Sequence, residues 1–199
     1  MLITEIEQKI RGHSPEIIDT KRANAVMIPL IESDDGVCLL FETRSEKVWQ
    51  PGETCFPGGG IEPGETVRDA AVRECCEELG ISRSDIEIIE DFDILTGLGG
   101  FVLYSVVGKM NTKYIHLNTE EVADVFTVPL DFFIDTPPLA FDFPLEPQIP
   151  KDFDYSVFGV EGLYPWRKSV SRVYSWKYKE HYIWGLTARL VYQFIEKLR

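Results

Sequence analysis

The chain has 199 residues, of which 33 are acidic and 20 are basic, and its formal net charge is -13. Free nucleic acid and anionic membranes are poor partners for such a chain, because both require basic surface to release counterions or bind headgroups. The length suits one domain with a well-filled core, and a composition of 44% hydrophobic and 27% charged residues is that of an ordinary soluble globular protein.

The first residues, MLITEIEQKIRGHSPEI, lack a basic head followed by a sustained apolar run. No later stretch approaches the roughly 20 apolar residues that span a bilayer, so we expect a cytoplasmic protein with no membrane partner. The cysteines form no CxxC pair, and we expect reduced thiols that act as small buried hydrophobic side chains. They are Cys38, Cys55, Cys75 and Cys76.

The predicted elements begin with a short amphipathic helix over residues 2–10, within an N-terminal arm of residues 1–22. Two strand-like runs follow over residues 23–31 and 37–45. The turn signal SDDG at residues 33–36 separates them, so they predict a hairpin.

A glycine-rich loop, CFPGGGIEPGE, leads into a helix predicted from about residue 65 to residue 79. Gly80 closes it, because glycine suits the left-handed position after a helix end. Further strands are predicted over residues 86–97, 101–110 and 123–130.

The proline-rich stretch of residues 137–150 predicts a packed loop, because it has too many prolines for a central strand. Residues 172–185 alternate as a strand does. Residues 185–199 predict a terminal helix whose buried stripe carries positions 186, 190, 194 and 198. Mixed strands with interspersed helices indicate an α/β fold in a single domain of residues 1–199.

Three acids, Glu74, Glu77 and Glu78, fall within one turn of the predicted helix over residues 65–79. At 100° per residue they project into an arc of about 100°, opposite an apolar face. Like charges four residues apart repel by roughly 0.2 to 0.5 kcal/mol per pair, and no Lys or Arg lies within the arc. A hard divalent cation, Mg²⁺ or Mn²⁺, would offset this repulsion while bridging to phosphate oxygens. A solvated acidic face is the alternative.

The neighbours of this acidic arc suggest how it is supported. Arg73 lies one turn from both Asp69 and Glu77 and is expected to hold the arc in register by ion pairing. The glycines at residues 58–60 would let the backbone approach a ligand where a Cβ would collide. The small alanines at residues 70–71 lie on the acidic side and would also permit close approach.

This segment resembles the Nudix box, whose pattern is Gly, five spacers, Glu, seven spacers, then Arg-Glu-apolar-x-Glu-Glu-x-Gly-apolar. The pattern is filled by Gly59, Glu65, Arg73, Glu74, Cys75, Glu77, Glu78, Gly80 and Ile81. Nine fixed positions over 23 residues make the match specific. The resemblance implies hydrolysis of a nucleoside diphosphate linked to another group, on a Nudix-type α/β/α sandwich around a mixed β-sheet.

The resemblance also implies catalytic roles within the box. Glu74 and Glu78 would be the main metal ligands, and Glu77 would be a third ligand or the base that takes a proton from water. Glu65 would pair with Arg73 as a structural brace. A remote base, Glu120 or Glu121 in the loop NTEEV, is the alternative, and a plain solvent-exposed turn is the simpler interpretation of that loop.

The residues before the box resemble a narrower signature, that of the coenzyme A diphosphatase branch of the family. In that branch a strand ending in Arg-Ser leads through Gly to Phe-Pro-Gly-Gly. The matching residues are Arg44, Ser45, Gly52, Phe56, Pro57, Gly58 and Gly59. Near the C-terminus, HYIWGLTARLVYQF resembles the branch's Ile-Trp-Gly-Thr-Ala segment. The resemblance runs from about residue 25 to the C-terminus, with residues 137–180 as a variable insertion.

Two positions depart from that branch. Glu42 stands where the branch usually has Thr, and an Arg that is a phosphate-binding candidate is missing near Trp49. Arg44 and Lys47 would still supply charge-assisted bonds to phosphates, although both also suit a plain basic surface beside a strand.

The branch implies cleavage of coenzyme A or an acyl derivative into 3′,5′-ADP and a 4′-phosphopantetheine product. The substrate-binding residues it implies are Arg44, Lys47, Phe56, Gly58 and Gly59. Another nucleotide substrate and a sensor that binds without cleavage are the alternatives. The basic and aromatic segment of residues 166–179 would stack an adenine or meet a remote phosphate, or it is an edge strand protected by lysines. The sequence leaves a homodimer open.

Overall fold

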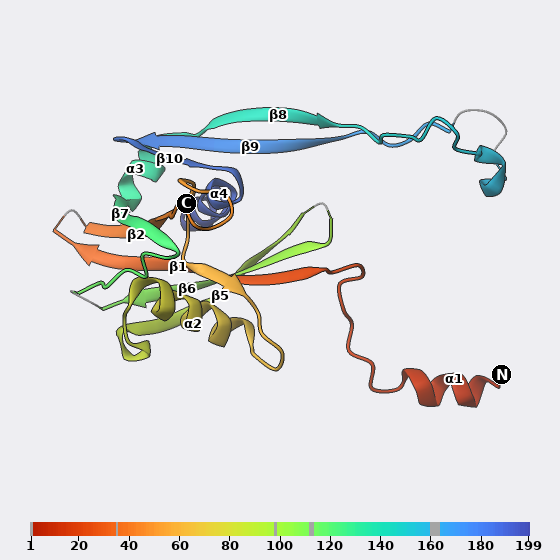
Figure 1. Cartoon of the computed structure of the whole chain (residues 1–199), viewed down its shortest axis with the longest axis horizontal. Coiled ribbons are helices and arrows are strands. Elements are labelled where there is room, and N and C mark those ends of the chain that lie inside the picture. The colour runs from red at the N-terminus through yellow and green to blue at the C-terminus, as the bar shows by residue number, and fades with distance from the viewer. Residues whose placement is uncertain (1, 35, 98, 112–113, 160–163) are drawn as a thin grey trace.

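A mixed seven-stranded sheet with a smaller three-stranded sheet above it forms the framework of the protein (Figure 1). The computed structural model describes residues 2–34, 36–97, 99–111, 114–159 and 164–199. Its elements in chain order are α1 (Ile3–Ile10), β1 (Arg22–Ser33), β2 (Gly36–Arg44), β3 (Thr54–Cys55), β4 (Gly58–Gly60), α2 (Val67–Leu79), η1 (Arg83–Asp85), β5 (Ile86–Gly97), β6 (Phe101–Met110), β7 (Val122–Pro129), α3 (Leu130–Asp135), β8 (Leu139–Leu145), η2 (Tyr155–Phe158), β9 (Ser169–Tyr178), β10 (His181–Trp184) and α4 (Gly185–Leu198).

Strand β1 lies at the centre of the larger sheet, whose order is β3-β2-β1-β6-β5, with β4 paired to β1 and β7 paired to β2. The β1–β6 pair is parallel, and the other pairs of this sheet are antiparallel. Strands β1 and β2 pair from Leu30 with Leu39 to Ser33 with Gly36, which confirms the predicted hairpin. Asp35 of the predicted turn lies outside the described residues.

Both faces of this sheet are covered, and the side chains of β1 show it. Ala25 and Met27 pack in the core beneath α2, whereas Val26 and Ile28 pack in the core that holds α4. A strand buried on both faces must be apolar at successive positions, as the β1 run is. The helices lie on opposite sides of the sheet (Figure 1), so the predicted α/β/α sandwich around a mixed sheet is confirmed.

Helix α2 has a capping residue at each end. The Thr66 hydroxyl oxygen accepts a hydrogen bond from the Asp69 backbone N–H at 3.1 Å, which caps the start. Gly80 ends the helix with a φ of 60°, the left-handed conformation expected there. Ala70 and Ala71 are fully buried beneath the helix, which corrects the expectation that they lie on the acidic side.

The prediction of a packed loop over residues 137–150 is wrong, because residues 139–145 form strand β8 at the edge of the smaller sheet, whose order is β10-β9-β8. An edge strand tolerates Pro144, which has no N–H to donate. Phe141 and Phe143 are more than half exposed, so this strand is not packed. Strands β8 and β9 form an arm that extends away from the rest of the protein (Figure 1). The strand alternation predicted over residues 172–185 is confirmed by β9 and β10.

Helix α4 covers the face of the large sheet opposite α2 and packs in the core on that side. Of the predicted stripe, Leu190 and Phe194 are buried, whereas Leu186 and Leu198 are about half exposed. The predicted N-terminal helix forms as α1, which buries none of its residues and lies apart from the sheets (Figure 1). Within the described ranges, no helix has the length and apolar character needed to cross a membrane.

Candidate active site

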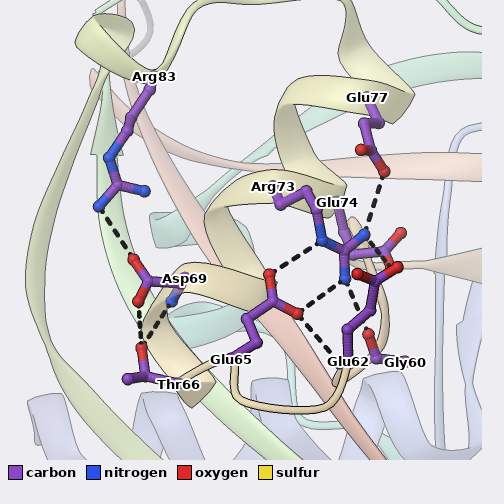
Figure 2. Close-up of polar contacts among 9 residues, drawn as sticks. All are labelled: Gly60, Glu62, Glu65, Thr66, Asp69, Arg73, Glu74, Glu77 and Arg83. Carbon is purple, nitrogen blue, oxygen red and sulfur yellow. Dashed lines mark hydrogen bonds and ion pairs between the residues drawn. The ribbon is translucent and has the colours of Figure 1, made fainter.

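Arg73 joins the acidic residues around α2 into one network (Figure 2). Its Nε and Nη2 donate to the two carboxylate oxygens of Glu65 at 2.9 and 3.1 Å, so the brace implied by the sequence is present. Its Nη1 donates to Glu74 Oε1 at 2.8 Å and to Glu77 Oε2 at 3.1 Å, and its Nη2 also donates to the Gly60 carbonyl at 2.9 Å. Arg73 therefore supplies positive charge to the acidic arc from its border.

The expected pairing of Arg73 with Asp69 does not form. Asp69 instead accepts a hydrogen bond from the Thr66 hydroxyl at 2.7 Å and pairs with Arg83 at 3.3 Å (Figure 2). Asp69 thus belongs to the cap at the start of the helix and not to the acidic arc.

The three acids of the arc differ strongly in burial. The side chain of Glu77 is 56% exposed and that of Glu74 is 16% exposed, while Glu78 as a residue is 5% exposed. Glu78 Oε2 accepts a hydrogen bond from the Gly58 backbone N–H at 2.8 Å, which fixes its carboxylate against β4. Burial raises the pKa of Glu78 and of Glu74, because desolvation disfavours the charged form. Glu74 and Glu78 therefore point inward, and Glu77 points toward solvent.

A fourth acid, Glu42 of β2, joins them from the sheet. Glu42 is 1% exposed, and its Oε1 accepts a hydrogen bond from the Cys55 thiol at 3.2 Å. Its Oε2 has no hydrogen-bond partner within the described part of the chain. Burial raises the pKa of Glu42, and the negative charge of Glu42 in turn helps to raise the pKa of Glu78. We call Glu42, Glu74 and Glu78 the inner acid group.

The sequence carries a signal for Glu42 besides its departure from the family pattern. An acid stands in the otherwise apolar run VCLLF-E of β2, whose preceding residues are buried in both cores. A carboxylate at the end of such a run must be desolvated, and a desolvated acid beside other acids marks a candidate functional site.

The two loop acids considered as a remote base point to different places. Glu120 pairs with Lys47 at 2.5 Å on exposed surface, so both of these side chains are engaged with each other. The charge of Glu121 contributes to the raised pKa of Glu42, Glu74 and Glu78, which places it near the inner acid group. A role for either loop acid as the remote base stays a prediction.

The glycines of β4 are needed for close contacts within the chain itself. A Cβ on Gly59 would lie 2.5 Å from the carboxylate carbon of Glu74. Gly58 has a φ of 155° and lies against the backbone of β1 at Ala25. The absent side chains thus allow the inner acid group to sit directly against β4.

We predict that Gly59→Ala lowers activity by about 10²-fold, because the added methyl group displaces the Glu74 carboxylate and a shift of about 1 Å can have that effect. Stability should change little, since a flexible side-chain end is what has to move. Gly60→Ala is the matched control, because nothing lies within 4 Å of a Cβ built there. Steady-state kinetics and thermal unfolding of both variants measure the two effects, and equal activities would contradict this account.

A cavity of about 760 Å³ opens on the α4 side of the large sheet. It lies among the start of β1, the loop between β2 and β4, and the start of α4. Of the predicted substrate-binding residues, Arg44, Phe56 and Gly58 line it, whereas Lys47 and Gly59 do not. The cavity adjoins the inner acid group, because Gly58 donates to Glu78 and the lining residue Cys55 donates to Glu42.

The inner acid group suits a divalent cation by its chemistry. Oxygen ligands are what Mg²⁺ and Mn²⁺ prefer, and the Glu42 Oε2 atom and the desolvated Glu78 carboxylate would both gain from a cation. Within the described residues, no group of three or more His, Cys, Asp or Glu side chains is already placed to hold one. Glu74 and Glu77 are bonded to Arg73 instead. Ligation by Glu74, Glu77 and Glu78 stays a prediction.

The sequence is similar to known proteins of one family. The NUDIX domain model matches residues 21–147. The chain is 27% identical over 183 residues to the uncharacterized Nudix hydrolase NudL of Photorhabdus laumondii, covering 91% of this chain and 87% of that protein. It is 34% identical over 113 residues to the peroxisomal coenzyme A diphosphatase NUDT7 of Mus musculus, covering 55% of this chain and only 48% of that protein.

Among solved structures, a Nudix hydrolase from M. smegmatis, RenU, superposes with a TM-score of 0.50 at 22% identity, covering 59% of this chain and 76% of that chain. A likeness at this identity concerns the fold alone. Because the family model spans well over half of the sequence and the box residues gather around one buried acidic group, the chain belongs to the NUDIX domain family.

Proposed function

We propose that the protein is a metal-dependent pyrophosphohydrolase that acts on a nucleoside diphosphate linked to another group. The observation that supports this most is the contact between the buried inner acid group and a ligand-sized cavity, made through Gly58 and Cys55. Enzymes of this family generally use divalent metals, and the oxygen donors here suit Mg²⁺ or Mn²⁺.

In this proposal Glu74 and Glu78 hold the metal, with Glu77 as a further ligand or as the base. A bound divalent cation supplies charge neutralisation at the phosphate oxygens and lowers the pKa of a water molecule. Glu121 is the alternative acceptor of the proton that the attacking water loses. Because either acid would receive the proton directly, each must lie within hydrogen-bond reach of that water.

The remaining residues position these groups. Arg73 and Glu65 hold Glu74 and Glu77 through the bonds described above, and the Gly58 N–H orients Glu78. Arg44 lines the cavity, and it donates through its Nε to the Trp49 carbonyl at 2.8 Å and through its Nη1 to the Cys55 sulfur at 3.9 Å, which holds the cavity loop. Arg44 would donate charge-assisted hydrogen bonds to a phosphate bound there.

We propose coenzyme A or an acyl derivative as the substrate, with 3′,5′-ADP and a 4′-phosphopantetheine product. The match of residues 44–59 to the coenzyme A diphosphatase branch supports this choice, as does the similarity to a mouse coenzyme A diphosphatase. A cavity of about 760 Å³ falls within the size of sites that bind small organic ligands. Another nucleotide, such as ADP-ribose, a nucleotide sugar, a dinucleotide or a nucleoside triphosphate, is the enzymatic alternative.

A substrate panel tests both parts of the proposal. The purified chain is incubated with Mg²⁺ or Mn²⁺ and with coenzyme A, acetyl coenzyme A, ADP-ribose, a dinucleotide or a nucleoside triphosphate, and the products are separated. We expect coenzyme A and its acyl form to be cleaved fastest, and no cleavage when the metal is chelated. Rapid cleavage of ADP-ribose beside unchanged coenzyme A would overturn the substrate. Binding of a nucleotide without cleavage under any divalent ion would favour a sensor.

We further propose that residues 1–199 act as one Nudix domain in which residues 137–180 are an insertion. The base of that insertion packs in the core, because Trp176 is buried and its ring centroid lies 5.4 Å from that of Phe133. A homodimer stays a prediction, and light scattering distinguishes it by comparing the mass in solution with 22.8 kDa.

A further inference from the structure

The cavity is positively charged in a protein that is strongly acidic overall. Among the described residues that line it, Lys21, Arg22 and Arg44 are cations and Glu53 is an acid. The whole chain has the opposite balance, with 33 acids and 20 Lys and Arg residues. A cavity whose charge opposes that of the protein attracts an anionic ligand, because its walls concentrate the field.

The basic segment of residues 166–179 does not provide this charge. Arg172 pairs with Asp142 at 2.6 Å and Lys168 pairs with Glu146 at 2.7 Å across the β8–β9 arm. None of the basic residues in this segment lines the cavity. The alternative of an edge strand protected by lysines is wrong for this segment, because β9 lies between β8 and β10. The cavity takes its cations from Lys21, β1 and β2.

Lys21 and Arg22 are held at the cavity by their backbone. Both of their N–H groups donate to the Gly100 carbonyl, at 2.8 and 3.2 Å, and Arg22 is in register with Phe101 of β6. Neither side chain forms an ion pair with an acid in the described ranges. Two anchored cations without acidic partners at a cavity are suited to bind an anion from solution.

The position of these cations relative to the inner acid group follows from the strand. Arg22, Asn24 and Val26 lie at alternate positions of β1 and all line the cavity, and Val26 is in register with Gly58. Four residues of strand separate Arg22 from Val26 by about 13 Å, measured between backbone positions. An anion bound by Lys21 and Arg22 would therefore lie apart from a diphosphate bound beside the inner acid group. A nucleoside would fit between the two.

Aromatic side chains line the same cavity. Trp49 is 79% exposed and Trp184 is 47% exposed, and both line the cavity together with Phe101. Large aromatic surfaces left open beside a cavity suit a flat ring, because stacking removes both faces from water. The cavity thus combines a ring-binding surface with a cationic end.

We infer that Lys21 and Arg22 form a subsite for a second phosphate, a phosphomonoester carried on the nucleoside side of the substrate, with the base against Trp49 or Trp184. This inference rests on the proposed function, because the inner acid group sets where the diphosphate lies. In this inference, Lys21 and Arg22 make the phosphate contact that the branch's Arg near Trp49, missing here, would make.

Binding of two products tests the subsite without catalysis. Adenosine 3′,5′-bisphosphate and AMP differ by the second phosphate, and calorimetry measures the affinity of the metal-free protein for each. We expect the bisphosphate to bind at least about tenfold more tightly, as hydrogen bonds to a charged group predict. The double variant Lys21→Gln/Arg22→Gln should lose this preference and bind AMP within about twofold of the wild type. Lys197→Gln, an exposed change at the end of α4, should keep the preference.

Equal affinities of the wild-type protein for the two nucleotides would overturn the inference. A preference that survives in the double variant would overturn it as well. Both replaced side chains are exposed, so the variant should unfold at the wild-type temperature. The single variants add a check, since each should lose part of the preference.

Hydrolysis separates the inference from the proposed function. The ratio of kcat/KM for coenzyme A to that for dephospho-coenzyme A should be at least about ten in the wild type and near one in the double variant. Cleavage of both compounds at equal rates by the wild type would sink the subsite while the proposed function stands. A bisphosphate preference without cleavage of any diphosphate would sink the proposed function while the subsite stands.

Discussion

Glu78→Gln is expected to lower kcat by about 10³-fold while the protein stays folded. Glu78 is the most buried acid of the Nudix box and is oriented by the Gly58 N–H at 2.8 Å. The amide keeps the size of the carboxylate but lacks the negative charge that a divalent cation requires. Because a neutral group is easier to bury than a charged one, the unfolding temperature should be unchanged or higher.

Steady-state kinetics on the cleaved substrate and a thermal unfolding scan measure these two effects. Glu87→Gln on exposed β5 is the control, because it removes the same charge from the surface and should keep full activity. A Glu78→Gln protein with wild-type turnover would show that Glu78 has no part in the reaction. A protein that is inactive because it has unfolded would be recognised in the scan.

Arg73→Lys is expected to lower the free energy of unfolding by about 2 to 4 kcal/mol, since a lysine ammonium cannot reproduce two parallel bonds to a carboxylate and three further contacts. The Arg73 side chain is 26% exposed and that of its partner Glu65 is 14% exposed, so solvent screens the pair only in part. Activity should fall too, because Glu74 and Glu77 lose the donor that positions them.

Urea unfolding measures the stability change, and Arg68→Lys is the matched control. Arg68 also binds two acids, Glu90 and Asp91, but its side chain is 43% exposed. The control should cost less than about 1 kcal/mol, as surface ion pairs do. A double-mutant cycle of Arg73→Lys with Glu65→Gln should give a coupling energy above about 1 kcal/mol. Equal losses for the two arginines would contradict the assigned brace.

The sequence alone determined the parts of the site that are close together along the chain. The helical repeat places Arg73 one turn from Glu77, and the loop before α2 returns Glu65 to the same arginine. The end of α2 at Gly80 and the hairpin of β1 and β2 follow from turn chemistry in the same way. Such features depend on local geometry, so a pattern of residue types is sufficient to predict them.

Packing decides which faces of the helices and strands are buried, and the sequence alone predicted these faces less well. Ala70 and Ala71 are small enough for either a core or an open site, and only the sheet beneath α2 shows that they are core residues. Residues 139–145 became a strand because β9 pairs with them, although the prolines of residues 137–150 argued against it. The edge position that makes Pro144 acceptable exists only in the assembled sheet.

Tertiary structure also decided which distant residues share the site. The charges of Glu42 and Glu121 act on Glu78 because strand pairing brings β2 and the loop before β7 near α2, whereas Glu120 pairs with Lys47. Arg22 reaches the cavity through the parallel pairing of β1 with β6, and Lys21 through its backbone hydrogen bond to Gly100 just before β6. Local sequence specifies the hydrophobic period of each element and the caps of each helix. Strand order and register are set by long-range burial, and they determine which charged side chains become neighbours.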